Sequence, residues 1–483
     1  MTNSETNGAA VGSAPRTGAA GRTLLILLCL AQFMLILDVA VVAVAVPSIQ
    51  GEFGVPTADI QWVSTAYSLA FGGFLVSSGR AADLFGPKRI LLVGITVFTI
   101  GSALCGFAGD ALMLFIARAI QGFGAALVSP AALTLVTTSF GEGEGRNKAL
   151  GIWGAVSSGG AIAGQLLGGV LTDLAGWRSI FLINLPIGLV VAIAVIKIVR
   201  RDPPRGEGRT DVFGASLLTA GVVLLVAAVS QLAEHGASAL VLIAGSAGIL
   251  VLVAFVLYAL RASNPIIRLS MFRNGNVRYG NLICVLTSGA ATVSVFFSSL
   301  YLQRVLGYSP LQAGMGFAPV TLVILVISSR TGSLVQRFGV RTLLLGSAVL
   351  TGVGAVLLSL APADGNYWAH VLPGLVISGA GAALSFAPAM IVSTTGVADN
   401  EQGLASGLLS TSQQIGAALW LAILNTVVAS VIASAPDGTS REAMTSGFQA
   451  GFLWLLVVPV LTVLCVLALP RTRTTDQAAP AGH

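Results

Sequence analysis

The amino-acid sequence predicts an all-α polytopic membrane protein with fourteen transmembrane helices. Only 9% of its 483 residues are charged and 55% are hydrophobic, whereas soluble domains carry about 25% charged residues. The mean hydropathy is +0.90, and 58 glycines provide the small residues that let membrane helices approach one another closely. A soluble fold with so little charge would lack the polar side chains that cover a surface, so we expect a bilayer around most of the chain.

Fourteen apolar runs follow one another along the chain, each with at least the 18 residues that cross a bilayer. The segments between them hold most of the charged residues. An even number of spans places both chain ends on the same side of the membrane. We expect spans near residues 24–46, 61–79, 90–109, 111–136, 149–171, 179–199, 212–232, 238–260, 279–302, 312–331, 342–361, 368–394, 404–431 and 448–469.

The first 22 residues form a polar segment rich in glycine, alanine and serine. The apolar run that follows, from Leu24 to Val46, is longer than the hydrophobic region of a signal peptide and lacks a clear small-residue cleavage pattern. We therefore expect a retained first helix, preceded by a cytoplasmic tail of residues 1–22.

The basic residues indicate which way the spans run. With both chain ends in the cytoplasm, all but four of the 25 Lys and Arg residues fall in cytoplasmic segments or at cytoplasmic helix ends, as the positive-inside rule requires. The exceptions are Arg118, inside a span, and Arg178, Arg304 and Arg441 on the outside. We expect a multi-pass protein of the cell membrane, plasma or inner, with both termini cytoplasmic.

The distribution of charged and reactive residues argues against several other classes of protein. The net charge of +6 comes from short loops that act as topology signals, and not from a basic face for nucleic acid. Cys29, Cys105, Cys284 and Cys465 lie in apolar runs without metal-ligand spacing. No G-x-x-x-x-G-K-[ST] loop is present, which argues against ATP as the energy source. We expect no enzyme activity, no catalytic residue, no metal, no disulfide and no cofactor.

Two basic loops divide the chain. Lys197–Asp211 follows the sixth apolar run, and Arg261–Arg278 follows the eighth. This division predicts a six-helix half at residues 23–200, linker loops with two inserted helices at 201–277, a second six-helix half at 278–470 and a cytoplasmic tail at 471–483.

An internal repeat supports this division. GFGAAL at 122–127 matches GAGAAL at 379–384. A second match, at an offset of 253 residues, pairs Gly79/Gly332, Phe85/Phe338, Gly86/Gly339, Lys88/Arg341, Leu91/Leu344 and Leu92/Leu345. Two six-helix halves around a central cavity are a transporter architecture, although repeated small-residue packing can imitate such homology.

The segment GRAADLFGPKR resembles the signature between helices two and three of the major facilitator superfamily. The matching residues are Gly79, Asp83, Gly86, Lys88 and Arg89. Glycines permit a tight cytoplasmic turn, and Asp83 can cap a helix start or approach a helix N-terminus of the other half. The resemblance implies a conformational latch between the halves. A plain turn with a topology signal is the alternative, and it is at least as good for Lys88 and Arg89.

Asp38 is the one acidic residue placed well inside an expected span. Its surroundings, LDVAVVAVAVP, resemble the helix-one signature of the fourteen-helix drug:proton antiporters, a branch of that superfamily. Ala40 and Ala43 replace the usual polar residues, which leaves Asp38 isolated. A charged residue inside a membrane costs at least ~2.5–3.5 kcal/mol, and desolvation favours a protonated carboxyl. We expect Asp38 to bind a proton or a cationic substrate in turn, with a structural ion pair or a capping contact as the alternative.

Arg118 and Gln121 lie three residues apart in the fourth run and share a helix face. With Gly122 they resemble the helix-four signature of the family. Asp38 lies ~13 Å and Arg118 ~11 Å from the outer helix ends, so the two side chains can form a pair. We expect Asp38 and Arg118 to couple transport to protons and Gln121 to face a substrate cavity. A purely structural pair is the alternative.

The fifth run, GGAIAGQLLGGVL, resembles the antiporter signature Gly-x-x-x-Gly-Pro-x-x-Gly-Gly. The matching glycines, which allow close helix packing, are Gly160, Gly164, Gly168 and Gly169. Gln165 replaces the proline, which removes the expected kink and adds a second candidate for the substrate cavity. Trp177 and Arg178, in GWRSIFLINLPIG, resemble the same branch, and we expect them to be interfacial anchors.

The second half has no counterpart of the two buried charges, because the repeat places Ala291 and Leu375 at those positions. We therefore expect proton handling in the first half alone. The polar residues of the second half either contact a substrate or bond between helices, and the latter is favoured for most of them: Asn281, Gln303, Gln413, Gln414 and Asn425.

These resemblances imply proton-coupled efflux of drug-like or antibiotic-like small molecules by alternating access. The partners are then protons, a small-molecule substrate and the lipid bilayer, without nucleic acid, and we expect a functional monomer. A transporter that imports or exports a metabolite is the alternative, because one fold serves many functions. A membrane sensor or enzyme is weaker still, since the sequence shows no reactive cluster and no soluble output domain.

Overall fold

The computed structural model of the chain describes residues 19–55, 60, 62–140, 144–199, 211–235, 238–262, 265, 269–308, 310–398, 401–437 and 440–470. Within these ranges every regular element is a helix and no strand is present. The all-α class predicted from the sequence is therefore confirmed.

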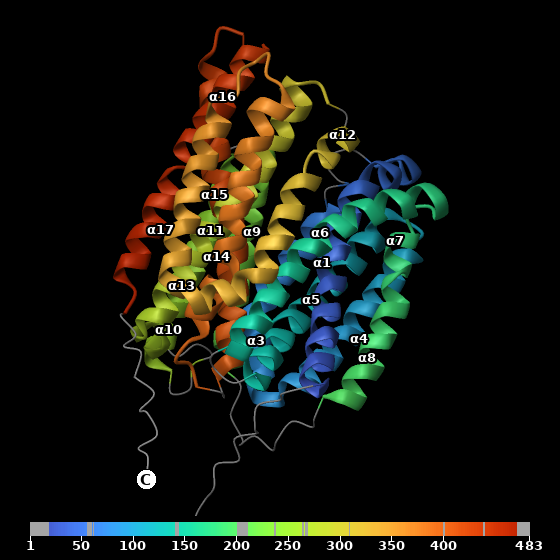
Figure 1. The fold of residues 1–483 in the computed structure, drawn as a ribbon. Helices are drawn as coiled ribbons and strands as arrows, with labels where there is room; N and C mark the ends of the chain where they lie inside the picture. The colour runs from blue at the N-terminus through green and yellow to red at the C-terminus, as the bar shows by residue number, and fades with distance from the viewer. Residues whose placement is uncertain are drawn as a thin grey trace, which may run out of the picture.

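The first half of the chain supplies six long helices to the bundle (Figure 1). The last of them is made of α7 and α8, which follow each other within the apolar stretch Ser179–Ile198. The elements are α1 (Ala19–Phe53), α3 (Trp62–Phe85), α4 (Pro87–Gly106), α5 (Ala111–Ser139), α6 (Glu144–Ala175), α7 (Ser179–Leu182) and α8 (Asn184–Ile198).

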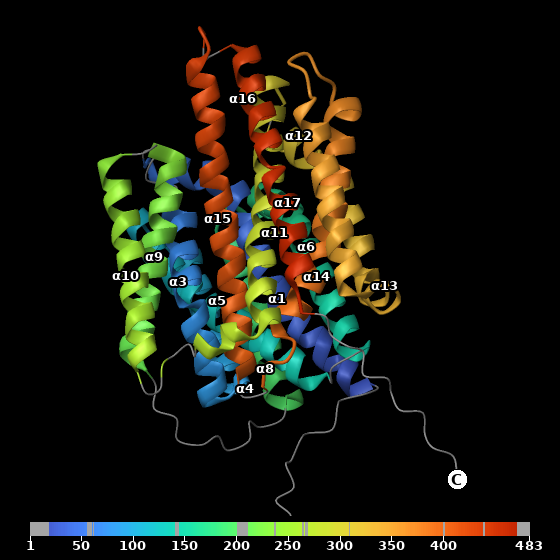
Figure 2. The same cartoon turned by 90° about the vertical axis from the view of Figure 1, so that its left-hand side faces the viewer.

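A helix pair, α9 (Val212–His235) and α10 (Ala239–Arg261), follows the first half. Figure 2 shows this pair beside the main bundle, and α9 contacts both α3 and α15. Ser77 Oγ on α3 lies 3.1 Å from Thr219 Oγ1 on α9. Val222 packs in one apolar cluster with Val76 and Leu404. The pair falls in the segment expected to hold two inserted helices, and it touches both halves.

The second half repeats the up-and-down arrangement beside the first (Figures 1 and 2). Its elements are η1 (Leu269–Arg273), α11 (Gly275–Leu300), η2 (Tyr301–Val305), α12 (Pro310–Met315), α13 (Ala318–Ser359), η3 (Tyr367–Val371), α14 (Leu372–Thr394), α15 (Gln402–Ser434), α16 (Arg441–Trp454) and α17 (Val457–Ala468).

Ten helices in the described part of the chain are long and apolar enough to cross a membrane. One of them, Gln312–Ser359, consists of two helices joined at Gly339, whose φ of 79° interrupts the helical backbone. α3, α6 and α9 lie alongside these helices in the bundle although they are not among the ten. The arrangement is compatible with the fourteen spans expected from the sequence.

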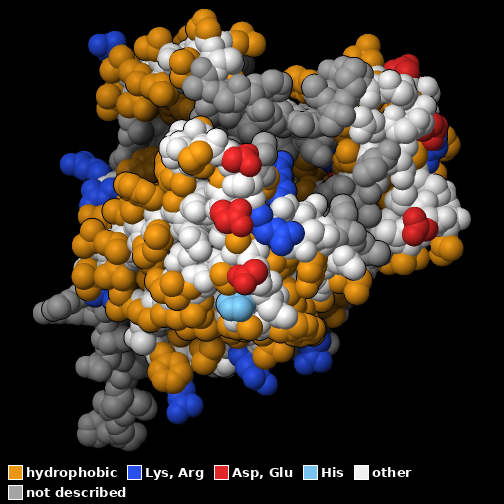
Figure 3. Space-filling view, turned by 90° about the horizontal axis from the view of Figure 1, so that it is seen from above, with side chains coloured by type: hydrophobic (Ala, Val, Ile, Leu, Met, Phe, Trp, Pro, Cys, Tyr) orange, Lys and Arg blue, Asp and Glu red, His pale blue; other side chains and the backbone are white. Residues whose placement is uncertain are grey.

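The surface of the bundle is apolar where lipid would surround it. Figure 3 views the molecule along the helices, with many hydrophobic side chains along its outline and several acidic side chains on the end face. On α10, Leu240, Leu250 and Leu260 are largely exposed, at 77%, 67% and 66%. Such large exposed apolar surfaces mark contact with a membrane.

The end of α3 differs from the prediction. The helix continues to Phe85, so Gly79 lies inside it and not in the expected turn. A Cβ atom on Gly79 would lie 2.2 Å from the carbonyl oxygen of Gly403 on α15. The expectation of a glycine turn fits Gly86, where φ is 95°. Gly79 is small because two helices from different halves cross there, and local sequence does not reveal such a contact.

The internal repeat has a structural counterpart at the end of each half. Lys88 Nζ donates to the carbonyl oxygen of Val199, at 2.6 Å, at the end of α8. Its repeat partner Arg341 donates through Nη2 to the carbonyl oxygen of Leu469, just after α17. In both halves a basic side chain therefore caps the C-terminus of the last helix, where it complements the negative end of the helix dipole.

Three of the four glycines of the fifth-helix signature pack α6 against α1. Cβ atoms on Gly160, Gly164 and Gly168 would lie 3.2, 2.5 and 2.9 Å from atoms of α1. The nearest of these atoms to Gly164 is the Cβ of Ala40. Gly169 differs, because no atom of a neighbouring helix in the described part of the chain lies within 4 Å of a Cβ placed there. Close approach at three positions therefore sets the α1–α6 distance.

Gly164→Val should destabilise the protein, because the new side chain would overlap Ala40 and force α1 and α6 apart. Overpacking of this kind costs about 1–3 kcal/mol. Gly169→Val is the matched control, since it makes the same change in the same helix without a facing neighbour. Thermal unfolding of the purified protein in detergent measures the difference, and equal melting temperatures for the two variants would contradict the account.

Candidate functional site

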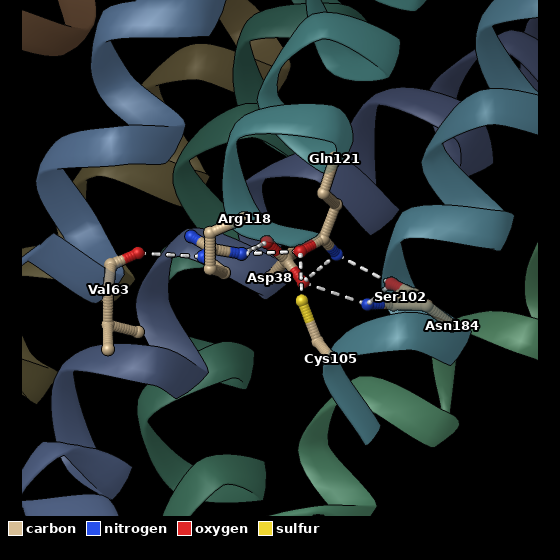
Figure 4. A network of polar contacts seen from close by, with 7 residues as sticks. All are labelled: Asp38, Val63, Ser102, Cys105, Arg118, Gln121 and Asn184. Atoms are coloured by element: carbon tan, nitrogen blue, oxygen red, sulfur yellow. Dashed lines mark hydrogen bonds and ion pairs between the residues drawn. The ribbon is translucent and has the colours of Figure 1, made fainter. Parts of the chain in front are cut away.

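Asp38 and Arg118 form a buried ion pair within the first half. Asp38 lies on α1 and Arg118 on α5, and Arg118 Nη1 is 2.6 Å from Asp38 Oδ2. Both are nearly inaccessible, with 0% and 1% of their surface exposed. Figure 4 shows the two side chains meeting at the centre of a polar network. Opposite charges withdrawn from water stabilise each other, whereas either one alone would be strongly destabilising.

Two amide side chains also donate to Asp38. Gln121 Nε2 lies 2.7 Å and Asn184 Nδ2 lies 2.9 Å from Asp38 Oδ1. Both amides contact Ser102 Oγ on α4, at 2.5 and 3.0 Å. The prediction that Asp38 is isolated is therefore wrong. Its partners come from α5 and α8, and not from later positions on its own helix.

The side-chain carbonyl oxygen of Asn184, Oδ1, is buried and has no hydrogen-bond partner among the described residues. An Asp38 carboxyl that took up a proton would need an acceptor for its O–H group. A half-turn of the Asn184 amide would present Oδ1 in place of Nδ2, because the two ends of an amide exchange donor and acceptor roles. The network thus contains partners for both the charged and the protonated form of Asp38.

Arg118 contacts several groups besides Asp38. Its Nε donates to the carbonyl oxygen of Val63 on α3, at 2.8 Å. Its Nη1 also donates to Gln121 Oε1, at 2.7 Å. The guanidinium carbon lies 4.3 Å from the ring centroid of Tyr67, a cation–π distance. Arginine remains charged in proteins, so these contacts stabilise a permanent positive charge.

The sequence identifies the two charges of this site but not Asn184, Ser102 and Tyr67. Asn184 lies within GWRSIFLINLPIG, which resembles the antiporter branch, and this resemblance is the available signal. Ser102 and Tyr67 are single polar residues in apolar runs and give none. Gln121, expected in a cavity, is fully buried in the Asp38 network and is not among the residues that line the described cavities.

A cavity of about 440 Å³ lies between the two halves. Helices α1, α3, α5 and α6 form one wall, and α14 and α15 form the other. Its polar lining residues are Gln32, Tyr67, Ser68, Ser129, Ser157, Ser410, Gln413 and Gln414, and its apolar ones are Leu35, Ile36, Val39, Ala40, Phe71 and Phe386.

A second cavity, of about 270 Å³, shares Phe386, Gln413 and Gln414 with the first. The two glutamines of α15, expected mainly to bond between helices, thus line both cavities. The side chain of Gln165, the other predicted cavity residue, lies outside the described residues.

Tyr67 lies between the ion pair and the cavity. Its ring covers the Arg118 guanidinium, and the same side chain lines the cavity. Phe71, one turn further along α3, stacks on Tyr67 with ring centroids 5.9 Å apart. A molecule in the cavity would therefore contact Tyr67, and through it the environment of Arg118.

Asp83 lies near the end of α3 and caps α15 of the other half. Its Oδ1 accepts from the backbone N–H of Gly403 and its Oδ2 from that of Leu404, both at 2.7 Å. The repeat partner in the second half, Gln336, is exposed. A carboxylate at a helix start satisfies free N–H groups and complements the positive end of the helix dipole. The first half of the repeat therefore caps a helix of the second half through Asp83, whereas the repeat-related Gln336 is exposed.

The other residues of the predicted latch have different positions. Gly79 lies against α15, next to the Asp83 contact. Gly86 forms the turn into α4, and Lys88 caps α8 inside the first half. Arg89 is exposed in the first turn of α4. The structure thus brings Gly79 and Asp83 to the contact between the halves.

Trp177 and Arg178 hold the far end of α1. Trp177 Nε1 donates to Glu52 Oε2 at 2.7 Å, and Arg178 Nη1 donates to Glu52 Oε1 at 2.6 Å. The hydrogen bond from Trp177, together with that from Arg178, lowers the pKa of Glu52 below its ordinary value. These contacts join α1 to the segment that begins α7, beyond the buried ion pair.

Two related halves that enclose a cavity give a small molecule a path across the membrane, which is the architecture of a secondary transporter. Comparison with known proteins identifies the family. The family model described as Major Facilitator Superfamily matches residues 28–421 and 281–481, and the chain belongs to this superfamily.

Two relatives match the chain over almost its whole length. It is 39% identical over 470 residues to the cephamycin export protein CmcT of Amycolatopsis lactamdurans. This match covers 95% of this chain and 96% of that protein. It is 38% identical over 473 residues to the puromycin resistance protein pur8 of Streptomyces alboniger, covering 95% and 93%.

A solved structure, that of the human organic anion transporter MFSD10 (TETRAN), matches with a TM-score of 0.65 at 16% identity. The match covers 92% of this chain and 99% of that one. At this level of identity the likeness supports the fold alone, and it agrees with the all-helical two-half arrangement.

A double-mutant cycle tests the ion pair. Arg118→Met leaves the Asp38 carboxylate buried without its countercharge. Asp38→Asn likewise leaves the Arg118 guanidinium buried without a countercharge. Breaking a buried pair from one side costs about 3–5 kcal/mol, whereas removing both charges costs much less. We expect the double variant to lose far less thermal stability in detergent than the sum of the single losses. Additive losses would show that the two residues do not interact.

Proposed function

We propose that the chain exports antibiotic-like or drug-like small molecules across the cell membrane in exchange for protons. The observation that carries the proposal is the Asp38 carboxyl, buried beside Arg118 and separated from a cavity by the ring of Tyr67. The names of the relatives refer to cephamycin and puromycin, which favours antibiotic export over transport of a metabolite.

In this proposal a proton competes with Arg118 for Asp38. Protonation removes the negative charge and so weakens the ion pair, while the Asn184 amide turns to accept the new O–H group. Arg118 stays charged and keeps its bond to the carbonyl of Val63. Because Val63 and Tyr67 both lie on α3, the protonation state of Asp38 acts on that helix.

Helix α3 connects the ion pair to the contact between the halves. Val63 lies at its beginning and Asp83 near its end, 20 residues later in a helix of 24 residues. An unbroken helix of this length moves as one element, so a shift at Val63 also displaces Asp83 relative to α15. Forming the Asp83 cap closes the halves on that side of the membrane, and breaking it lets them part.

We assign the Asp83 side of the bundle to the cytoplasm. The described chain begins α1 and ends α17 at this same end (Figure 1), and the basic residues of the sequence concentrate in the segments expected there. Both termini are then cytoplasmic, and the cavity faces outward while the Asp83 cap is formed. The monomer contains both halves and therefore the whole proposed transport cycle.

The proton gradient provides enough free energy for this cycle. One proton that moves through a potential of 100 mV releases ~2.3 kcal/mol. A tenfold concentration ratio corresponds to about 1.4 kcal/mol, so one proton per molecule supports a gradient of roughly 40-fold. A pH gradient across the membrane adds to this value.

Asp38→Asn should abolish export without preventing insertion into the membrane. The amide has almost the size of the carboxyl but cannot bind and release a proton. The test is the inhibitory concentration of a panel of antibiotics for a drug-sensitive host that expresses the variant, with the protein quantified in isolated membranes. Asp110→Asn is the control, because Asp110 caps the start of α5 and Asn caps a helix equally well. Full resistance with Asp38→Asn would refute the proton role.

Asp83→Ala should shift the transporter towards the state that is open to the cytoplasm. Hydrogen bonds to a charged group are worth about 1.5–3 kcal/mol each, so losing the two at α15 changes the population ratio at least tenfold. Spin labels at the start of α4 and at the Gly339 bend of α13, measured by double electron–electron resonance, report the separation of the halves. Gln336→Ala, at the repeat-related position, should leave the distances unchanged. Unchanged distances in Asp83→Ala would rule out the latch.

A further inference from the structure

We infer that the cavity between the halves selects uncharged molecules with hydrogen-bonding groups and discriminates against permanent cations. The inference rests on the proposed export function and defines the substrate class of the same cavity. It follows from the chemistry of the lining residues, from the position of the nearest acid, and from polar atoms that lack partners.

Neither cavity has a charged side chain among the described residues that line it. The lining of the larger cavity consists of amides, hydroxyls, aliphatic groups and the aromatic rings of Tyr67, Phe71 and Phe386. A permanent cation that left water for such a surface would lose its hydration without gaining a countercharge. Cation–π contacts with the rings offset only part of that penalty.

Asp38 is close to this cavity in sequence but not available to a ligand. Its neighbours Val39 and Ala40 line the cavity, whereas Asp38 is itself completely buried. Its charge is already neutralised by Arg118, and Tyr67 covers Arg118 on the cavity side. The acid that would attract a cation is therefore committed to the proton network.

Two polar atoms of the first half lack partners at the cavity. Gln32 Oε1 on α1 and Ser157 Oγ on α6 are buried without a hydrogen bond among the described residues, and both residues line the cavity. Buried polar atoms are normally satisfied. A ligand hydroxyl or amide N–H could donate to Gln32 Oε1, and Ser157 could accept from or donate to a second ligand group.

The opposite wall offers matching uncharged groups. Ser410, Gln413 and Gln414 project from α15 of the second half, and the glutamines extend the polar lining into the adjoining cavity. The larger space, of about 440 Å³, lies in the range of drug-sized binding sites, and the space of about 270 Å³ adjoins it. A neutral molecule with polar groups at both ends would thus bond to both halves, which an apolar cation cannot do.

Binding to the purified full-length protein in lipid nanodiscs tests the inference without a proton gradient. The neutral probes are chloramphenicol and thiamphenicol, which carry hydroxyl and amide N–H groups, and the cationic probes are tetraphenylphosphonium and ethidium. We expect wild type to bind the neutral pair at least tenfold more tightly than the cations. Gln32→Met, which removes the unpartnered carbonyl at similar length, should weaken neutral binding about fivefold to tenfold.

A variant that gains affinity for a cation must be folded, so it tests the inference without the ambiguity of a lost function. Gln32→Glu places a carboxylate in the cavity at almost the same size, and it should raise the affinity for tetraphenylphosphonium at least tenfold at pH 8. Gln303→Glu adds the same charge on η2, outside the cavity lining, and should not. Wild type that binds the cations as tightly as the neutral pair, or binds neither pair, overturns the inference. Selective neutral binding without proton-driven export would instead overturn the proposed function.

Discussion

A carboxylate buried among membrane-spanning helices must be neutralised, and this requirement organises the first half of the transporter. Asp38 on α1 accepts hydrogen bonds from Arg118 and Gln121 on α5 and from Asn184 on α8. Arg118 in turn donates to the carbonyl of Val63 on α3. Together these bonds join α1, α3, α5 and α8, and losing one leaves a buried group unsatisfied, which is costly where water is absent. One ion pair therefore holds four helices in register, and in the proposed cycle a proton on Asp38 weakens it.

The two halves share a fold but differ in chemistry. The first half contains the ion pair and, through Asp83, the side chain that caps a helix of its partner. The second half contributes uncharged walls to the cavity, with Gln413 and Gln414 on α15. Helix α15 thus meets both the cap at its beginning and the cavity two to three turns later. In the proposed cycle, two helices, α3 and α15, thus connect proton binding, closure of the halves and substrate contact.

Hydropathy predicts the helices well because a span in lipid must satisfy its own backbone, which restricts each apolar run to a helix. It also identifies Asp38 and Arg118, since charges inside apolar runs are rare. The remaining features depend on contacts between distant segments. Gly79 is expected in a turn but lies inside α3, because its backbone meets α15. Asn184 and Ser102 resemble many other polar residues in membrane helices, and only the packing of α4 against α5 and of α8 against α1 and α4 brings them to the ion pair.

The central claim is that substrate and protons move in opposite directions through one protein. The most direct measurement uses proteoliposomes that contain an exported antibiotic and a pH-sensitive dye, with the membrane potential clamped by potassium and valinomycin. When the antibiotic leaves down its gradient, the account predicts that the vesicle interior becomes more acidic, in proportion to the antibiotic released. Release of the antibiotic with no change of internal pH would contradict proton antiport.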